Sequence, residues 1–531
     1  MGSTETLAAP PLAVWKPKHN PWAIALVVTM ATFMEVLDTS IANVALPHMA
    51  GSLSASTDES TWVLSSYLVA NAVILPISAW LATRYGRKRF YMTCVVLFGV
   101  SSLLCGIAPS LSWLVFFRVI QGLGGGGLAP SEQAILADTF PPQKRGMAFA
   151  IYGMAVVLAP AIGPTLGGYI TDNFDWRWIF FINVPVAIVS LLLTSRLVED
   201  PPHLTAMRGR AGKVDYVGLG LIAVGIGAAQ VVLDKGQREG WFESNFILWF
   251  QIVSTICIIS AIFWEYFHEN PVIDVRLFKN RNFAVSCIMM FMLGAALFGA
   301  TVLLPQMVQT LMGYTAEQAG WVLSPGAVVI ILLLPFVGKM ISKIDPRYMI
   351  AFGFFAAGVA MLHMTEVNQD IDFRTIVLLR VYQMAGVAFL FVPIQTLCYV
   401  GIPMEKNNNI SGMINLARNM GGSIGIAGLE TILARRQQFH QTMLASHTSQ
   451  FDAPFQSTLA AITQGMIDAG YDAVTAARMA YAQIYGMVQA QSAWLAYIDT
   501  IYIYAFACLL VVPLAFLMKR PGKGAGPGAM H

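Results

Sequence analysis

Long apolar stretches, separated by short polar segments, follow one another along almost the whole chain. Most are roughly 20 residues long, which is the length an α-helix needs to cross a hydrocarbon core of about 30 Å. The pattern predicts an all-α integral membrane protein with about fourteen transmembrane helices, whose ends are defined to within a few residues. The predicted spans cover residues 22–47, 61–82, 90–109, 112–137, 146–171, 178–196, 215–234, 246–267, 283–311, 317–341, 348–365, 374–401, 408–434 and 496–518.

The composition favours a membrane protein over a soluble one. Hydrophobic residues make up 56% of the 531 residues and charged residues only 11%, and the mean hydropathy is +0.62. Soluble domains carry about 25% charged residues, so a soluble fold of this composition could not cover its surface with polar groups. The net charge of +3 comes from scattered residues, which gives no support for a nucleic-acid partner. The six cysteines lie inside apolar runs without CxxC spacing, so we expect neither a disulfide framework nor a metal site.

Lysine and arginine cluster beside alternate ends of the spans, and this asymmetry predicts the orientation of the chain. Seven clusters fall on one side of the membrane. They are Lys16 and Lys18; Arg84, Arg87, Lys88 and Arg89; Lys144 and Arg145; Arg208, Arg210 and Lys213; Arg276, Lys279 and Arg281; Lys339, Lys343 and Arg347; and Lys519, Arg520 and Lys523. Arg435 and Arg436 fall on the opposite side. We therefore expect both tails, residues 1–21 and 519–531, in the cytoplasm.

Segments of the chain repeat each other at near-constant spacing. TWVLSSYLVANAVILP (61–76) and GWVLSPGAVVIILLLP (320–335) share Trp-Val-Leu-Ser and a final Leu-Pro, and RVIQGLG (118–124) matches RVYQMAG (380–386). The spacings are 259 and 262 residues, and an ordered series of this kind indicates two homologous halves. The predicted domains are a six-helix half at 22–196, a linker with two inserted spans at 197–282, and a second six-helix half at 283–518.

The glycines of RVIQGLGGGGLAP (118–130) could bind a phosphate or could let two helices pack closely. A phosphate-binding loop needs a Lys-Ser/Thr pair after its glycines or a strand before them, and this segment has neither. Gly122 and Gly126 lie four residues apart within a span, a spacing that allows two helix backbones to approach closely in lipid. We expect helix packing, in which Gly126 does not accept a large side chain and Gly124 accepts alanine with little effect.

A second segment of small residues, GPTLGG (163–168), has the same pattern in the fifth predicted span. Gly163 and Gly167 are four residues apart, Gly168 adjoins them, and Pro164 removes one helix hydrogen bond. Glycine also costs a helix up to about 1 kcal/mol relative to alanine. We expect these helices to pack closely and to be able to bend and slide.

Four motifs together resemble the fourteen-span drug:proton antiporters of the major facilitator superfamily, of the EmrB/QacA type. VLDTSIANVALP (36–47) resembles the first-span signature of that family, and RVIQGLGGGG (118–127) resembles its Arg-x-x-Gln-Gly motif. APAIGPTLGG (159–168) resembles its antiporter signature, and WRWIFFINVP (176–185) is similarly typical. The resemblance covers almost the whole chain. It implies the major facilitator fold, with two pseudo-symmetric six-helix halves plus two inserted spans, in a bacterial inner membrane.

The loop after the second predicted span departs from the family pattern. The family reads Gly-x-Leu-Ala-Asp-x-x-Gly-Arg-Lys there, whereas this chain reads AWLATRYGRK, with Thr83 in place of the aspartate. The missing carboxylate leaves open whether the loop makes the charge contact that latches the outward-facing state. The alternative is that its basic residues only hold the loop in the cytoplasm. The candidate residues of a cytoplasmic gating loop are Arg84, Gly86, Arg87 and Lys88.

Ionisable side chains within the spans are the candidates for transport chemistry, because a charge at mid-membrane costs at least about 2.5 kcal/mol and persists only with a partner or a purpose. Glu35 and Asp38 lie three residues apart on one face of the first span, and Asp38 is expected at a depth similar to that of Arg118. The candidates for proton coupling and for a substrate cavity between the halves are Glu35, Asp38, Arg118, Gln121, Asn415 and Arg418.

Two roles stay open for the Asp38–Arg118 pair. It could take part in coupling, because burial and a neighbouring arginine both control whether a carboxyl group holds its proton. It could also be a static ion pair that fixes the register of two helices. Glu132 and Arg380 could lie in the membrane interior or near its interfaces. For the amides Gln121, Asn43 and Asn71 we expect hydrogen bonds between helices.

Residues 435–495 form the one long segment outside the predicted spans, on the periplasmic side. A first helix is expected from Pro454 to Gly470 and a second over residues 471–494. The resemblance implies a periplasmic membrane-fusion adaptor of the EmrA type as partner, with an outer-membrane channel beyond it. The alternative is a cap over the outer mouth of the transporter.

The sequence predicts a secondary transporter that exports amphipathic or lipophilic compounds in exchange for protons. We expect no cofactor, with the proton gradient as the energy source. A dedicated exporter of a metabolite, a fatty acid or a siderophore is the alternative within this class. A membrane-embedded enzyme would need a catalytic cluster, but the eight histidines are dispersed. A passive channel would not need an internal repeat that carries antiporter motifs.

Overall fold

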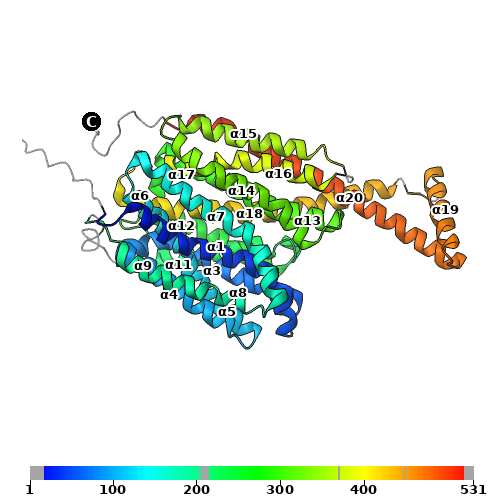
Figure 1. Ribbon diagram of the computed structural model, residues 1–531, viewed down its shortest axis with the longest axis horizontal. Coiled ribbons are helices and arrows are strands. Elements are labelled where there is room, and N and C mark those ends of the chain that lie inside the picture. Colours follow the sequence, from blue (N-terminus) through cyan, green and yellow to red (C-terminus); the bar gives the residue numbers. More distant parts are fainter. Residues whose placement is uncertain are drawn as a thin grey trace, which may run out of the picture.

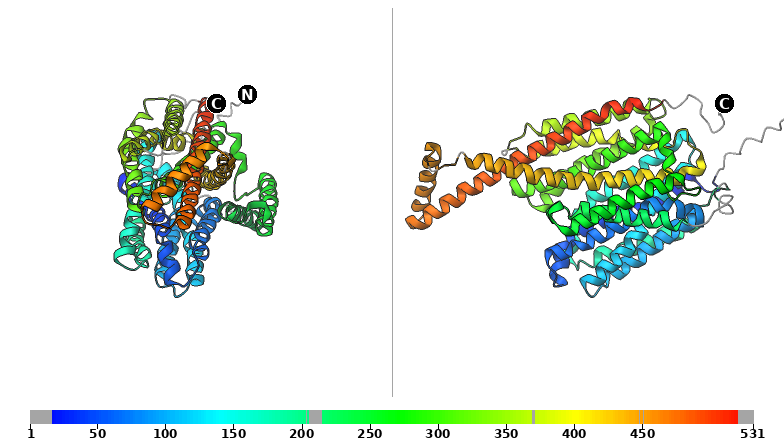
Figure 2. Two further views of the ribbon diagram at one scale, coloured as in Figure 1. Left: turned by 90° about the vertical axis from the view of Figure 1, so that its right-hand side faces the viewer. Right: turned by 180° about the vertical axis from the view of Figure 1, so that it is seen from behind.

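The computed structural model describes residues 17–202, 204, 215–368, 371–446, 448–449 and 451–519. Within these residues the chain forms helices and no strand. Most helices lie side by side in a bundle, and one helical hairpin projects from it (Figures 1 and 2). The terminal end of the bundle is the end where the first helix begins, and the hairpin end is the opposite one. The basic residues Lys16, Arg208, Arg210, Lys213, Arg520 and Lys523 lie outside the described residues.

The N-terminal helices form one group, which ends at Leu197. The long helices α1 and α7 pack against each other, and α5 packs between α3 and α4. The elements of this group are α1 (Pro21–Ser52), α2 (Thr57–Ser60), α3 (Trp62–Tyr85), α4 (Arg87–Gly106), α5 (Leu111–Gly125), α6 (Leu128–Thr139), α7 (Pro142–Asn173), α8 (Trp178–Phe181) and α9 (Asn183–Leu197).

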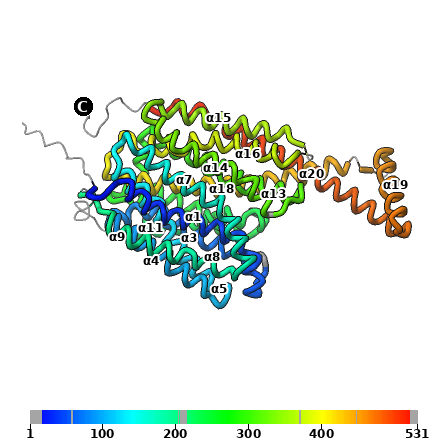
Figure 3. The backbone as a smooth tube through the Cα atoms, in the orientation of Figure 1, coloured from blue at the N-terminus to red at the C-terminus, as the bar shows by residue number. Residues whose placement is uncertain are grey.

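The remaining helices form a second group, coloured from green to red in Figure 3, and an inserted pair, which stands beside the bundle in the left view of Figure 2. The inserted pair consists of α11 (Tyr216–Lys235) and α12 (Asn245–Phe267), which pack on each other, and α11 also packs on α3. The second group contains α13 (Arg281–Leu311), α14 (Ala316–Met340), α15 (Pro346–Met364), α16 (Phe373–Ala388), α17 (Phe391–Leu397), α18 (Asn407–Ser446), α19 (Ala453–Asp468) and α20 (Ala473–Val511). Short 3-10 helices are η1 (Trp241–Glu243), η2 (Val275–Lys279), η3 (Met404–Lys406) and η4 (Val512–Leu517).

Thirteen helical segments of the described chain are long and apolar enough to cross a membrane, some of them made of two consecutive helices. They coincide with thirteen of the predicted spans, so the prediction of an all-α integral membrane protein is confirmed. The remaining predicted span, 408–434, lies within α18, which is long enough to cross but more polar than the others. Helix α18 packs against α13 and α20 on one side and against α3 and α6 on the other. Because protein surrounds this helix, it can carry polar residues that a lipid-facing helix could not.

The fourth and twelfth predicted spans are each broken into two helices. The first break separates α5 from α6 at Gly126 and Gly127, and the second separates α16 from α17 at Phe389 and Leu390. The breaks occupy corresponding positions in the internal repeat, since Gly127 and Phe389 are 262 residues apart. The glycine run therefore both packs a helix face and ends a helix.

Four of the predicted packing glycines lie in close helix contacts, namely Gly122, Gly126, Gly163 and Gly167. A Cβ atom at Gly122 would overlap the backbone carbonyl of Tyr67 in α3, and one at Gly163 would overlap Ser40 in α1. At Gly167 the nearest atoms belong to Ile41, and the closest would be 3.2 Å away. Pro164 lies inside the continuous helix α7. Close packing by these glycines is what the sequence pattern indicated.

Two details of the glycine prediction are wrong. Gly168 faces open space, because a Cβ atom placed there would have no neighbouring atom within 4 Å, so it makes no close contact. Gly124 is enclosed, because a Cβ atom there would lie 2.8 Å from the backbone nitrogen of Phe98 and 2.9 Å from the carbonyl oxygen of Cys94. Backbone atoms cannot move aside as a flexible side chain can, so alanine at Gly124 would force α4 and α5 apart.

The hairpin is built by two long helices and one short one. Helices α18 and α20 continue beyond the bundle, and α19 joins them at the tip (Figure 1). The first predicted helix corresponds to α19, followed by Gly470 at φ +97°, a backbone conformation that favours glycine. The second is not separate, because residues 473–511 form the single helix α20. Hydrogen bonds from Thr475 and Val474 to the Asp472 carboxylate cap α20 and lower the pKa of that carboxyl.

A contact of three ionisable groups joins the two long helices at the base of the hairpin. The Asp499 carboxylate of α20 lies 2.8 Å from Nε2 of His440 and 3.5 Å from Nε of Arg436, both in α18. Towards the tip, the rings of Phe455 and Tyr481 are 6.1 Å apart. Trp494 of α20 is buried, at 5% exposure. The exposed apolar residues of the hairpin include Phe451, Tyr471, Val474, Tyr481, Tyr485 and Met487.

The contact of α5 with α3 predicts a large difference between two glycine substitutions. Gly126→Leu should lower stability by about 2 kcal/mol or more, because its Cβ would overlap Ile74 and lie 2.5 Å from the carbonyl oxygen of Asn71. Gly168→Leu is the matched control and should change stability little. Thermal unfolding of both variants in detergent measures the difference, and equal midpoints would contradict the packing assigned to Gly126.

Candidate functional site

A buried polar network surrounds Asp38 in the N-terminal group. Its Oδ2 accepts a hydrogen bond from NH1 of Arg118 at 2.5 Å, and its Oδ1 accepts from Gln121 at 3.0 Å and from Asn183 at 2.7 Å. The Nε group of Arg118 donates to the carbonyl of Val63 at 3.0 Å. Both members of the ion pair are buried completely. The network therefore joins α1, α3, α5 and α9 around one charge pair.

The surroundings of Arg118 add to its stabilisation. The guanidinium carbon lies 4.3 Å from the ring centre of Tyr67 and 5.7 Å from that of Phe180, so both rings interact with the cation. Three donors satisfy the Asp38 carboxylate, as a buried charge requires. This geometry suits the second of the two roles left open by the sequence, an ion pair that fixes the arrangement of helices.

A second polar cluster lies where the two groups of helices meet. The Glu35 carboxylate accepts a hydrogen bond from Asn71 at 2.9 Å, and Glu132 accepts one from Thr29 at 2.6 Å. The other carboxylate oxygen of Glu132 is buried without a hydrogen-bond partner among the described residues. Arg418, from α18 of the second group, is close enough to act electrostatically on both carboxylates. Glu35 is half-buried and Glu132 is buried, so Glu132 does not lie at an exposed interface.

Helix α18 presents a row of polar side chains to the N-terminal group. Arg418 donates to the hydroxyl of Tyr152 at 3.1 Å, and Asn419 donates to Asn71 at 3.4 Å. The side chains of Asn415 and Gln133 are joined by two hydrogen bonds, of 2.7 and 3.2 Å. Gln395 of α17 donates to the same Gln133 oxygen at 2.6 Å. Residues spaced by three and four positions share one helix face, so this single face of α18 forms much of the seam between the groups.

The seam is closed at the terminal end by a cluster around Arg87. Its guanidinium donates to Asp138 of α6 at 2.6 Å and to Asn408 of α18 at 2.8 Å. Asn407 donates to the other oxygen of Asp138 at 2.5 Å, and Asn408 donates to Thr83 at 3.1 Å. Thr83 thus makes a neutral hydrogen bond to the second group, at the position where the family pattern has an aspartate. The carboxylate that pairs with Arg87 comes from α6 instead.

The other residues of the predicted gating loop have separate positions. Gly86 adopts φ +95° between α3 and α4, so the turn favours glycine at this position. Lys88 lies on the N-terminal group, where its Nζ donates to the carbonyl of Ser195 at 2.6 Å. The guanidinium of Arg84 lies 5.7 Å from the ring centre of Trp80. Arg87 makes a hydrogen bond across the seam, to Asn408.

The predictions from the sequence missed some site residues and misplaced others. Asp138, Asn407 and Asn408 were not recognised, although a carboxylate at the end of a span and a run of asparagines at the start of another could have served as signals. Asn43 was expected to bond between helices, but it is exposed, and its side chain makes no hydrogen bond to the described residues. Arg380 is buried at 3% exposure, in the interior of the second group.

Two groups of membrane-spanning helices thus meet along a seam of polar and ionisable residues. The chain belongs to the Major Facilitator Superfamily, whose family model matches residues 28–426. It is therefore a multi-pass membrane protein of a transporter family.

Relatives of the chain agree with the resemblance drawn from its motifs. It is 37% identical to the probable multidrug resistance protein EmrY of Escherichia coli K12 over 96% of this chain and 97% of that protein. It is 35% identical to the multidrug export protein EmrB of the same strain, over 96% and 97%. The identity to the fatty acid resistance protein FarB of Neisseria gonorrhoeae is 35%, over 95% and 97%.

A solved structure shares the fold at low sequence identity. The human organic anion transporter MFSD10 superposes with a TM-score of 0.61 at 12% identity, over 94% of this chain and all of that one. This likeness confirms the major facilitator fold.

The Asp38 network predicts that its two charges depend on each other. Asp38→Asn should lower the free energy of unfolding by about 3–5 kcal/mol, because Arg118 would remain buried without its carboxylate. The double variant Asp38→Asn/Arg118→Gln removes both charges and should regain much of that loss. Thermal unfolding of the single and double variants in detergent tests this coupling, and additive losses would show that the two side chains act independently.

Proposed function

We propose that this protein is a proton-coupled efflux antiporter that exports amphipathic or lipophilic compounds across the bacterial inner membrane by alternating access. The observation that carries the proposal is that the carboxylates of the N-terminal group face α18 of the second group across the seam: Asn71 hydrogen-bonds to both Glu35 and Asn419, and Arg418 lies within electrostatic range of Glu35 and Glu132. The names of its relatives, which include multidrug export and resistance proteins, support the choice of cargo.

In this proposal, proton uptake and release take place at the seam, where the two groups must move. Glu35 and Glu132 belong to the N-terminal group, and Arg418 belongs to the second, so opening the seam changes their separation. An arginine nearby stabilises the ionised form of a carboxyl group, and its departure favours uptake of a proton. The Asp38–Arg118 pair lies wholly within one group and serves in this scheme as the support that holds α1 in place.

Closure at one end of the seam fits a cycle of alternating access. The Arg87 cluster joins the groups at the terminal end, and Gly146 of α7 lies against Gly338 of α14, where a Cβ atom would be 3.0 Å from the Gly338 carbonyl oxygen. In the proposed orientation, with both tails in the cytoplasm, these contacts close the cytoplasmic side. Export then requires the Arg87 cluster to break and reform once in each cycle.

The hairpin suits a partner outside the membrane. In the proposed orientation it projects into the periplasm (Figure 2), and no step of alternating access needs it. Its exposed apolar residues form more apolar surface than a solitary cap should leave in water. We infer a docking surface for a membrane-fusion adaptor of the EmrA type that leads to an outer-membrane channel, as in a tripartite export system.

A dedicated exporter of fatty acids or of a similar metabolite is the second candidate. The name of the relative FarB, a fatty acid resistance protein, favours it. Substrate-driven proton movement in proteoliposomes, measured over a panel of drugs, fatty acids and siderophores, separates a broad exporter from a dedicated one.

The proposed coupling predicts the effect of neutralising the seam carboxylates. Glu35→Gln and Glu132→Gln keep the side-chain shape and should lower substrate-driven proton exchange in proteoliposomes at least tenfold, an estimate of the scale expected when an essential proton carrier is lost. Glu317→Gln is the matched control, because Glu317 is exposed at the start of α14. Full exchange in both seam variants would remove these carboxylates from the mechanism.

The proposed docking predicts a difference between purified protein and cells. Removing residues 447–490 and joining α18 to α20 should leave proton exchange in proteoliposomes largely unchanged, because the bundle is intact. The same deletion should reduce drug resistance in cells and abolish co-purification with the adaptor. If adaptor binding and cellular efflux both survive the deletion, the hairpin is only a cap.

A further inference from the structure

Arg380 of α16 is a buried cation for which the described residues supply no anion. Its exposure is 3%, and one of its groups, NH1, donates to Oε1 of Gln383 at 2.6 Å. Its Nε group is buried without an acceptor. None of the ion pairs formed within the described part of the chain includes Arg380. A buried guanidinium in this state is costly to the fold unless something else neutralises it.

The internal repeat shows what is missing around Arg380. It corresponds to Arg118, and Gln383 corresponds to Gln121, at the same spacing of 262 residues. Tyr67, whose ring stacks against Arg118, corresponds to Gly326, which lies against the stem of Arg380. Helix α13, which matches α1, contains no acidic residue. The second group therefore contains counterparts of Arg118 and Gln121, but at the positions that match Asp38 and Tyr67 it has neither a carboxylate nor an aromatic ring.

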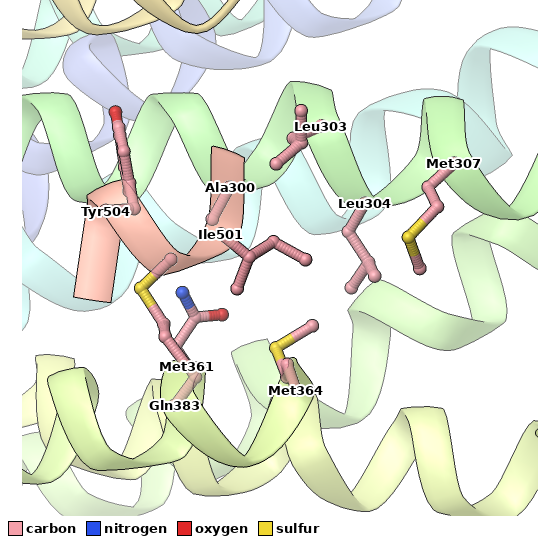
Figure 4. A pocket seen from close by; sticks show the side chains of 9 residues that line it. All are labelled: Ala300, Leu303, Leu304, Met307, Met361, Met364, Gln383, Ile501 and Tyr504. Atoms are coloured by element: carbon pink, nitrogen blue, oxygen red, sulfur yellow. The ribbon is translucent and has the colours of Figure 1, made fainter. Parts of the chain in front are cut away.

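A cavity adjoins this arginine through its hydrogen-bond partner. Gln383 forms part of the cavity wall, and its amide lies between Met361 and Ile501 (Figure 4). The remaining wall is apolar and contains three methionines, whose flexible side chains can adapt to a guest. The lining residues are Ala300, Leu303, Leu304, Met307, Met361, Met364, Gln383, Ile501 and Tyr504, from α13, α15, α16 and α20. The cavity is narrow in the present conformation, so a ligand has to displace methionine side chains.

We propose that the cavity between α13, α15, α16 and α20 binds an amphipathic anion, with Arg380 as the counter-charge of its headgroup and the methionine-lined wall around its chain. The site lies in the hairpin-end half of the bundle, since Arg380 is seven residues, or about 10 Å, from the start of α16. It lies within the second group and is separate from the seam cluster of Glu35, Glu132 and Arg418. The seam offers carboxylates, and this site offers an uncompensated cation.

A carboxylate or a phosphate headgroup would satisfy the site equally, because both accept bidentate hydrogen bonds from a guanidinium. The first would come from an exported acid and the second from a membrane lipid. The inference adds to the proposed function a defined binding site for an anionic cargo or lipid. It rests on that function for the direction of transport. Binding to purified protein tests it independently of any transport.

Equilibrium binding to the full-length protein in non-ionic detergent tests the proposal with four ten-carbon probes: decanoate, decyl phosphate, decanol and decyltrimethylammonium. We expect Arg380→Gln to weaken binding of the anionic probes about tenfold or more, while decanol and the cation bind as before. Ala300→Leu fills the cavity without touching Arg380 and should weaken the same probes. Arg374→Gln is the matched control, because Arg374 is exposed on the same helix. A loss confined to decyl phosphate would assign the site to lipid, and a loss that includes decanoate would assign it to an exported acid.

Stability separates a ligand site from a structural role. Without a ligand, Arg380→Gln should keep or raise the midpoint of thermal unfolding, since it removes an uncompensated buried charge. A structural arginine would give a lower midpoint instead. Unchanged decanoate and decyl phosphate binding in Arg380→Gln would overturn the proposal. Proton-coupled transport of a lipophilic cation should persist in this variant, and its absence in the wild-type protein would count against the proposed function alone.

Discussion

The contact of α18 with the N-terminal helices is the constraint on which the rest of the arrangement depends. One face of this helix carries asparagine and arginine side chains that bond to α3, α6 and α7. Its other sides pack on α13 and α20. A helix that exposed these side chains to lipid would be unstable, so α18 must stay enclosed. The two groups are thereby held together by polar contacts, which can exchange partners, rather than by interlocked apolar side chains alone.

Polar contacts of this kind suit a seam that has to open. An apolar interface in lipid gains little from closing, because lipid tails are as apolar as the helices. Hydrogen bonds within the seam give a specific closed state, and water entering an opened seam can replace them. The Arg87 cluster illustrates the point, since its partners Asp138 and Asn408 belong to different groups. The Asp38–Arg118 pair has the opposite character, because its four helices belong to one group and all three donors to its carboxylate come from that group.

The two halves have used one ancestral pattern in different ways. Arg118 is neutralised inside the protein by Asp38 and covered by Tyr67. Arg380 has the matching glutamine but an apolar helix opposite it and a narrow cavity beside it. The first arginine therefore contributes to the fold, and the second can serve a ligand. This asymmetry could be found only by comparing the surroundings of the two arginines, since their local sequences are alike.

Most of the helices could be predicted because the membrane imposes a simple rule on the sequence. Backbone groups in lipid must bond within a helix, so long apolar runs such as 283–311 have one solution. Glycine spacing likewise indicated the close contact of Gly122, because only a missing side chain allows two backbones to approach. The same reasoning failed at Gly168, since its spacing does not reveal that it faces open space. The sequence predicted a hairpin helix over 471–494 separate from the last span over 496–518, whereas the structure joins them in α20. The change from lipid to water alters the pattern of side chains but leaves the helix backbone uninterrupted.

The sequence by itself determined the membrane class, the positions of the spans, the repeat and the family, because each depends on residues that are close along the chain or on composition. Only the tertiary structure decided which side chains share a site. Asp138 and Asn407 are 269 residues apart, and Gln133 and Asn415 are 282 apart. No local pattern records such pairings, because they arise from the packing of whole helices. The same holds for Arg380, which lies away from any acidic side chain of the described residues. Its isolation depends on all the helices that surround it and therefore cannot be read from its local sequence.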